Sequence, residues 1–527
     1  MTNDFNFRYQ YDRCYSRGIC SINPTTSSLQ EIILLYLKQA AYYGIEFEKK
    51  GISNNNIRNL ILNTISILSS NYEISENNFN MVNSAFKQEL PKIIEQFKTL
   101  SDEENPDAEI KATQDMLNKC SSLNDYIRLG EREFNRRVNS LSAEFRNLYK
   151  ILFVIVKSIC VNILICESFD VTPDSEVKLV FEIFNLLNNQ KTNKNELEKT
   201  IVTLAKADCN VIKQIQNKQE EFYGIPSEHE VSFSTSKGKC VLVVGSNLRE
   251  LECILDKLQE KKIDVYTHDN MILAHSYPKF KEYKNLKGQF GQGMENCLLD
   301  FSTFPGPILL TRYSLYNVEN LYRGLLYTTD FAYSKGVIQI KNDDFSEVIT
   351  SAINSKGFKT GKKCPSGTFG FNYQKIVENI KTRLETKKYT HIFVIGPEGY
   401  TKEEKDYFKT LIKRIPKNIL IISFACCDTL DNLICLNSPN DINAFLKLSE
   451  ELITMTEVKK AFFLPYCDRH TLSVVLYLNS LQKNHFFIGK WKQNILNPNI
   501  LDGITNNFNI KILTTPKENL SNIIPIN

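Results

Sequence analysis

The hydrophobic pattern of this chain changes its period near residue 238, and this change constrains the fold more than any other feature. Before it, apolar residues recur at the three- and four-residue spacing of amphipathic helices, as in "SSLQEIILLYLKQAAYYG" and "NIRNLILNTISILSS". After it, short β-rich runs alternate with helical stretches, which is typical of βαβ units and parallel sheets. The pattern therefore predicts a multidomain α + α/β protein, in which N-terminal helical bundles are followed by two Rossmann-like parallel-sheet domains.

Domain boundaries follow from the same pattern, because 527 residues are too many for one hydrophobic core. We expect a helical bundle domain over residues 1–237, a first Rossmann-like domain over 238–365 and a second over 366–527. The segment "SKGFKTGKKCPSGTFGFNY", residues 355–373, is rich in Gly and Lys and is predicted to be the linker between the two α/β domains. The predicted strands are "CVLVVG", "IDVYTH", "GPILLT" and "GVIQI", then "THIFVIG", "ILIISFACC", "AFFLPYC", "HFFIG" and "IKILTT".

Two features of the helical part have specific interpretations. Ser28 and Glu31 have the spacing of a capping box and predict where the first long helix begins, and Gly44 predicts where it ends. The most apolar segment is residues 151–166, "ILFVIVKSICVNILIC", which Lys157 and Asn162 interrupt. This segment is predicted to be a buried helix of a bundle and not a membrane span.

Charge and cysteine usage exclude several classes of protein. The net charge is +4 without a long Lys/Arg block, so nothing indicates a nucleic-acid partner, and no membrane partner is expected. The first twenty residues, "MTNDFNFRYQYDRCYSRGIC", lack the apolar core of a signal peptide, which favours a cytoplasmic protein. The fourteen cysteines are then expected to be free thiols.

Several motifs resemble segments of one known family. "DVYTHDNMILAHSYP" is similar to a Tyr-Thr-His-Gly-Glu segment, and "FPGPILLT", "LYTTDFAYSKGVIQI", "DDFSEVITSA" and "CYSRGICSINPTTSSLQEIILLY" also match in order. The chain resembles the hybrid cluster proteins, the hydroxylamine reductase or prismane family, which are relatives of nickel carbon monoxide dehydrogenases. The resemblance spans nearly the whole chain and implies the same architecture. It also implies an iron–sulfur oxidoreductase that reduces hydroxylamine or nitric oxide with an electron-donor protein.

The family holds a cubane-type cluster on four cysteines near the N-terminus. By resemblance, Cys14 and Cys20 occupy the second cysteine pair, whereas the first pair falls on "RYQY", with Arg8 and Tyr11. Two thiolates cannot hold a four-iron cluster without outside ligands. The resemblance therefore implies only a partial N-terminal cluster motif, and the alternative is that Cys14 and Cys20 are loop thiols.

The family's hybrid cluster takes four cysteines, one histidine and two glutamates, with a lysine nearby. By resemblance, the degenerate ligand positions in this chain are Ser246, Asn270, Ser314, Pro397 and Pro439. Cys426 in "FACC" matches a family cysteine, with Cys427 as the neighbouring alternative, and Asp468 and His470 align with the last glutamate and the lysine. Proline has no donor atom, and serine and asparagine replace thiolate, imidazole and carboxylate poorly. The resemblance thus predicts a cluster that is absent or incomplete.

Each of the other candidate sets of residues at the strand ends has two interpretations. Cys426, Asp468 and His470, with Cys427, Cys435 and Cys467, could hold a single iron or zinc, or could be buried thiols and a packed histidine. His268 and His275 are either catalytic or hold their loop through hydrogen bonds. The turn "VVGSNL" has the strand–Gly–helix form of a phosphate-binding turn but lacks Gly-x-Gly-x-x-Gly.

Three functions remain open from the sequence. The first is the family's redox enzyme. The second is a metal-poor descendant that keeps the scaffold for a binding, structural or regulatory role. The third is a small-molecule site in the cavity between the domains, lined by Ser246, Asn270, Ser314 and His470. We rank the second first, because so many ligand positions have changed at once.

Overall fold

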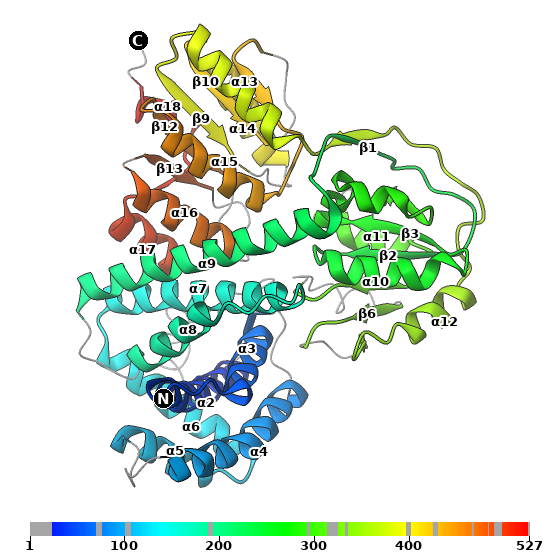
Figure 1. Cartoon of the computed structure of the whole chain (residues 1–527). Coiled ribbons are helices and arrows are strands. Elements are labelled where there is room, and N and C mark those ends of the chain that lie inside the picture. Colours follow the sequence, from blue (N-terminus) through cyan, green and yellow to red (C-terminus); the bar gives the residue numbers. More distant parts are fainter. Residues whose placement is uncertain are drawn as a thin grey trace. The chain divides into compact units, whose positions relative to one another are not determined.

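A computed structural model describes most of the chain (Figure 1). The described residues are 24–69, 76–100, 107–187, 193–291, 296–313, 325–331, 336–396, 402–424, 430–465, 468–482, 484–489 and 498–524. Two compact units share them: a helical unit (Met1–Val211, Phe331–Ser334 and Asn497–Gly503) and a sheet unit (Ile212–Asp330, Lys335–Leu496 and Ile504–Asn527). The division into three domains drawn from the sequence stays a prediction.

Helices make up the described N-terminal part, as the hydrophobic periodicity predicts. They are α2 (Pro24–Lys49), α3 (Asn55–Ser69), α4 (Glu76–Leu100), α5 (Ala108–Asn118), α6 (Leu123–Ser140), α7 (Ala143–Glu167), α8 (Asp174–Leu186) and α9 (Lys194–Tyr223). Figure 1 shows them as the blue to green-cyan bundle. The fold class is confirmed: this bundle precedes two parallel sheets of six strands each.

The predicted ends of the first helix are wrong. Ser28, Glu31 and Gly44 all lie inside α2. Glu31 instead accepts two hydrogen bonds of 3.0 Å from the Arg137 guanidinium of α6. Gly44 lies where α2 approaches α8 closely. A glycine is needed there, because a Cβ would lie 2.7 Å from the Phe181 ring of α8. Contacts with α6 and α8 therefore explain why Glu31 and Gly44 occur here, and these residues do not mark the ends of the helix.

Helix α7 contains the apolar segment 151–166. It is the one helix in the described part of the chain that is long and apolar enough to cross a membrane, and most of its apolar window is buried inside the protein. Ile151, Leu152, Ile155 and Ile159 are fully buried. The core helix of a soluble protein has this composition, which agrees with the prediction.

The first sheet has the strand order β4-β3-β2-β5-β6-β7, and every pairing is parallel. Its strands are β2 (Cys240–Val244), β3 (Asp264–His268), β4 (Leu286–Gln289), β5 (Ile308–Leu310), β6 (Leu326–Thr328) and β7 (Ile338–Gln339). The intervening helices are α10 (Leu248–Gln259), η1 (Asp269–Ser276), η2 (Pro278–Glu282), α11 (Cys297–Thr303) and α12 (Ser346–Asn354). This order is that of a doubly wound nucleotide-binding fold.

The second sheet repeats the same order, as β11-β10-β9-β12-β13-β14, again parallel throughout. Its strands are β9 (His391–Ile395), β10 (Ile419–Ser423), β11 (Leu433–Cys435), β12 (Lys459–Leu464), β13 (His485–Ile488) and β14 (Lys511–Ile512). Its helices are α13 (Tyr373–Thr386), α14 (Lys402–Arg414), α15 (Ile442–Met455), α16 (Arg469–Leu481), α17 (Pro498–Phe508) and α18 (Pro516–Ser521). In such folds ligands bind beyond the carboxyl ends of the strands.

The segment 355–373 is more than the predicted linker. It contains β8 (Gly367–Phe369), which pairs antiparallel with β1 (His229–Val231), and two isolated bridges extend the pairing, Thr235 with Lys362 and Gly238 with Phe358. We call this paired segment, residues 229–238 and 358–369, the ribbon. Its partner strand lies more than a hundred residues earlier, so local composition could not reveal the pairing.

The residues that flank the ribbon contact the carboxyl edges of both sheets. The Ser227 amide donates to the Ser276 carbonyl of η1, which follows β3. The Gly370 amide donates to the carbonyl of Asn437, which follows β11. The segments on either side of the ribbon therefore hold the loops that follow β3 and β11, where ligands bind in such folds.

Candidate functional site

The turn after β2 carries the first degenerate ligand position. Gly245 adopts a positive φ of 119°, Ser246 is exposed, and Asn247 caps α10 by accepting from the Arg249 and Glu250 amides. These two amides are the groups that a phosphate would use at a helix N-terminus. Because Asn247 already occupies them, the turn is poorly suited to binding a phosphate.

The loop after β3 places two histidines in different environments. His268 ends β3 and is fully buried, and its Nε2 lies 3.1 Å from Oδ2 of Asp300 on α11. Asn270, the second degenerate position, is partly buried in η1 directly after Asp269, which has a positive φ of 58°. The carboxylate of Asp300 holds the His268 ring in place from the neighbouring helix.

His275 belongs to a hydrogen-bonded network that holds the loop. Its Nε2 lies 2.9 Å from the Thr267 hydroxyl, which in turn donates to Oε1 of Gln289 over 2.6 Å. Burial, with His229 nearby, lowers the pKa of His275 to about 4. The ring is therefore neutral at physiological pH and ties η1 to β3, while Thr267 links β3 to β4. This geometry favours the loop-holding interpretation of His275 over the catalytic one.

A buried carboxylate joins three further elements at the same edge. Oε2 of Glu250 on α10 accepts from the Arg312 amide over 2.9 Å and from the Thr329 hydroxyl over 2.6 Å. The Arg312 guanidinium lies 3.7 Å from Oε1 of the same carboxylate. Burial raises the pKa of Glu250, and the charge of Arg312 opposes that increase. Strands β5 and β6 are thus tied to α10 where each strand ends.

The edge of the second sheet holds the other described positions. Asp468 caps α16, because its Oδ1 accepts from the Thr471 amide over 2.8 Å. His470 is partly buried beside Arg469, whose Nε lies 3.3 Å from the His470 Nε2, and burial with this cation lowers the pKa of His470 to about 4. Pro439 lies in a turn between Ser438 and α15. An Asp that caps a helix has a structural role that explains its presence.

The remaining candidates fall outside the described residues. They are Cys14, Cys20, Ser314, Pro397, Cys426, Cys427 and Cys467. Cys435 is described and ends β11 opposite Ser423. Within the described ranges, no group of three or more His, Cys, Asp or Glu side chains is placed to hold a metal ion. The single iron or zinc site stays a prediction.

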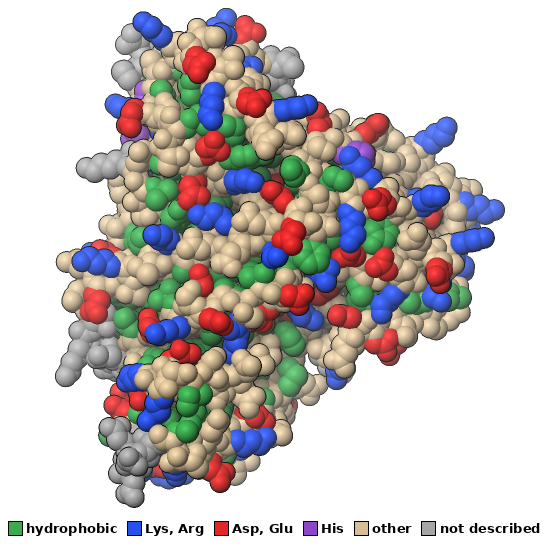
Figure 2. Space-filling model, viewed as in Figure 1, with side chains coloured by type: hydrophobic (Ala, Val, Ile, Leu, Met, Phe, Trp, Pro, Cys, Tyr) green, Lys and Arg blue, Asp and Glu red, His purple; other side chains and the backbone are tan. Residues whose placement is uncertain are grey.

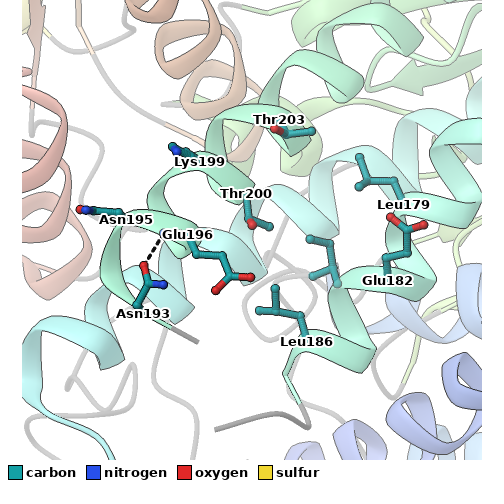
Figure 3. A pocket seen from close by; sticks show the side chains of 10 residues that line it. Leu179, Glu182, Leu186, Asn193, Asn195, Glu196, Lys199, Thr200 and Thr203 are labelled. Atoms are coloured by element: carbon teal, nitrogen blue, oxygen red, sulfur yellow. Dashed lines mark hydrogen bonds between the residues drawn. The ribbon is translucent and has the colours of Figure 1, made fainter. Parts of the chain in front are cut away.

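A hollow of about 540 Å³ lies between α8 and the start of α9 (Figure 3). Leu179, Ile183 and Leu186 form its apolar side, and the carboxylates of Glu182 and Glu196 point into it. All its lining residues belong to the helical unit, so the hollow is no part of either sheet edge. The predicted small-molecule cavity lined by Ser246, Asn270, Ser314 and His470 stays a prediction.

Sequence reasoning missed four residues of this region: His229, Glu250, Asp300 and Arg312. Glu250 and Arg312 resemble ordinary surface charges in the sequence, and the burial of Glu250 beside the partly buried Arg312 emerges only from the packing of α10 on the sheet. His229 lies in β1 of the ribbon, which the sequence does not predict, and its influence on the pKa of His275 could not be foreseen. The available signal for Arg312 was its position in the sequence, because it is a polar residue just after an apolar predicted strand.

Comparisons with known proteins give a consistent result. A model of the "Prismane/CO dehydrogenase family" matches residues 10–432. A hydroxylamine reductase of Actinobacillus succinogenes is 25% identical, over 97% of this chain and 96% of its own length. One of Thermodesulfovibrio yellowstonii is 22% identical, over 97% of this chain and 98% of its own length.

A solved structure is also similar. It contains the α subunits of an acetyl-CoA synthase/carbon monoxide dehydrogenase with NiZn[Fe4S4] and NiNi[Fe4S4] clusters. The TM-score is 0.47 at 11% identity, with 96% of this chain and 83% of that chain covered.

Proposed function

Because this chain belongs to the Prismane/CO dehydrogenase family, we propose that it is a metal-poor member that keeps the scaffold of these iron–sulfur proteins without an intact hybrid cluster. Its role is then a cytoplasmic binding, structural or regulatory one, and the family's redox activity is lost or altered. The observation that carries the proposal is the chemistry of the side chains at the ligand positions. Two serines, one asparagine and two prolines stand where, by the resemblance, the family has metal donors.

The described geometry at Ser246 and Asp468 supports this proposal. Ser246 is exposed at the surface, and the Asp468 carboxylate accepts from a helix amide. Neither arrangement presents a soft donor to iron. Thiolates and imidazoles are the side chains that bind iron best in such clusters. The donor set therefore does not fit the family's cluster.

Hydrogen-bond networks, an ion pair and apolar packing then take the place of a metal in stabilising the sheet edges. His275 with Thr267 and Gln289 holds one loop, and Glu250 with Arg312 holds another. A protein stabilised by such contacts folds without a metal. A protein whose fold depends on a metal is, in contrast, stabilised when the metal binds.

A chelator test follows from this difference. We expect the melting temperature of anaerobically purified protein to be unchanged by a metal chelator, because no bound metal contributes to its stability. The hydroxylamine reductase of Actinobacillus succinogenes, treated in the same way, is the comparison protein. A clear drop for this chain would contradict the proposal.

A second candidate function is that of an iron–sulfur oxidoreductase that reduces hydroxylamine or nitric oxide. The observation in its favour is the full-length match to proteins named hydroxylamine reductase. It requires iron on the chain and an electron-donor protein. Reduction of hydroxylamine by the anaerobic protein with a chemical reductant would support this candidate.

A further inference from the structure

Lysines crowd the amino-terminal edge of the first sheet, opposite the candidate site. They lie in the turns that precede β2, β3 and β4 and in the chain that follows α12. We call these ten residues the lysine-rich edge: Lys237, Lys239, Lys261, Lys262, Lys284, Lys287, Lys356, Lys359, Lys362 and Lys363. The turns that carry them, residues 237–239, 261–263, 284–287 and 355–363, contain no Asp or Glu.

Backbone hydrogen bonds hold these turns together. The Asp264 amide donates to the Lys239 carbonyl, which joins the starts of β2 and β3. Gly238 and Phe358 exchange backbone hydrogen bonds of 3.0 and 2.8 Å, which fixes the chain after α12 against the turn before β2. Because the strands are parallel and in register, their first residues lie at one edge. The lysines therefore form one surface although they come from four segments.

The lysine-rich edge is exposed and largely uncompensated. All its members are exposed except Lys287, which is partly buried. Lys287 lies 3.6 Å from Asp264, and among the described residues no other member forms an ion pair. Figure 2 shows Lys and Arg side chains gathered over this end of the first sheet, at the right of the view. Concentrated charge of one sign on a chain of net charge +4 creates a strong local potential.

We propose that the lysine-rich edge is a docking surface for the acidic face of a partner protein. Complementary charge steers such encounters and speeds association. Lysines are strongly hydrated point charges on flexible stems, which suits a carboxylate-rich face without fixed geometry.

Two other classes of anionic partner fit the surface less well. The edge contains no arginine, the residue that binds phosphate in two-pronged geometry. Its aromatic ring, Phe358, packs on Tyr266 and Phe304 at 5.7 and 5.6 Å, so it is not available to stack on bases. Ile263, Leu286 and Phe358 are buried or partly buried. Ile353 at the end of α12 is exposed beside the edge, but a single side chain is a small apolar anchor for a lipid surface.

The test uses a fluorescent glutamate-rich peptide as the probe, with the full-length chain. The variant Lys359→Glu/Lys362→Glu/Lys363→Glu is expected to weaken peptide binding by roughly tenfold or more, because it reverses three of the ten charges of the surface. Binding by the unchanged chain should weaken as salt is raised. A matched variant, Lys402→Glu/Lys405→Glu/Lys409→Glu on exposed positions of α14, makes the same change of net charge elsewhere and should bind the peptide nearly as well as the unchanged chain.

Circular dichroism establishes that both variants fold. Equal losses in the two variants would overturn the proposal, because net charge and not the edge would then control binding. A DNA duplex or phosphatidylserine vesicles that bind more tightly than the peptide, with the same sensitivity to the first variant, would overturn it in favour of nucleic acid or membrane.

Discussion

Replacing Phe463 by alanine is expected to lower the free energy of unfolding of the sheet unit by about 3–5 kcal/mol, the usual cost of deleting a buried aromatic ring. Phe463 lies in β12 and is fully buried. Its ring stacks on Phe487 of β13 with centroids 5.0 Å apart and meets Phe393 of β9 at 5.4 Å. These three strands form the centre of the second sheet, so the cavity cannot collapse without moving the sheet.

Chemical denaturation followed by circular dichroism measures this loss. Phe463→Leu is the matched control, because leucine keeps most of the apolar volume and should cost roughly 1–2 kcal/mol. An alanine variant as stable as the unchanged chain would mean that this packed core does not hold the sheet unit. The apolar core would then be too weak to replace a metal as the source of stability.

Replacing Glu250 by alanine is expected to cost about 3 kcal/mol, because it removes one partner of a buried ion pair. The Arg312 amide and the Thr329 hydroxyl lose their acceptor, and the partly buried Arg312 guanidinium loses its counter-charge. Glu250→Gln retains an acceptor oxygen of nearly the same size and should cost about 1 kcal/mol, as for a weakened hydrogen bond.

The same denaturation experiment checks the Glu250 variants. Glu260→Ala, at an exposed residue just beyond α10, is the control for loss of a carboxylate and should change stability by less than about 0.5 kcal/mol. If alanine at position 250 costs no more than alanine at position 260, the Glu250 network does not stabilise the sheet edge.

Much of the fold could be predicted because its signals are local. Long apolar runs such as "CVLVV" and "ILIIS" became β2 and β10, where both faces of a parallel sheet are buried. Strand β4, "LKGQ", carries no such run and was missed, because pairing with β3 and not its own composition makes it a strand. The ribbon was missed for the same reason.

The candidate site was less predictable, because its geometry depends on long-range packing. The sequence indicated that polar residues collect where strands end, and Asp468 and His470 do lie there. It could not indicate that Asp468 caps a helix, or that His275 is neutral in a buried network. Those roles depend on the hydrogen-bond partner of each side chain, which the fold supplies.

Iron and acid-labile sulfide analysis of anaerobically purified protein, together with its absorption spectrum, tests the central claim most directly. Under this proposal, too few thiolates remain at the ligand positions to hold iron in an iron–sulfur cluster. The protein should therefore be colourless, with far less than one iron per chain and without the broad visible absorption of iron–sulfur clusters. Brown protein that holds several irons and sulfides per chain would contradict the account and favour the reductase.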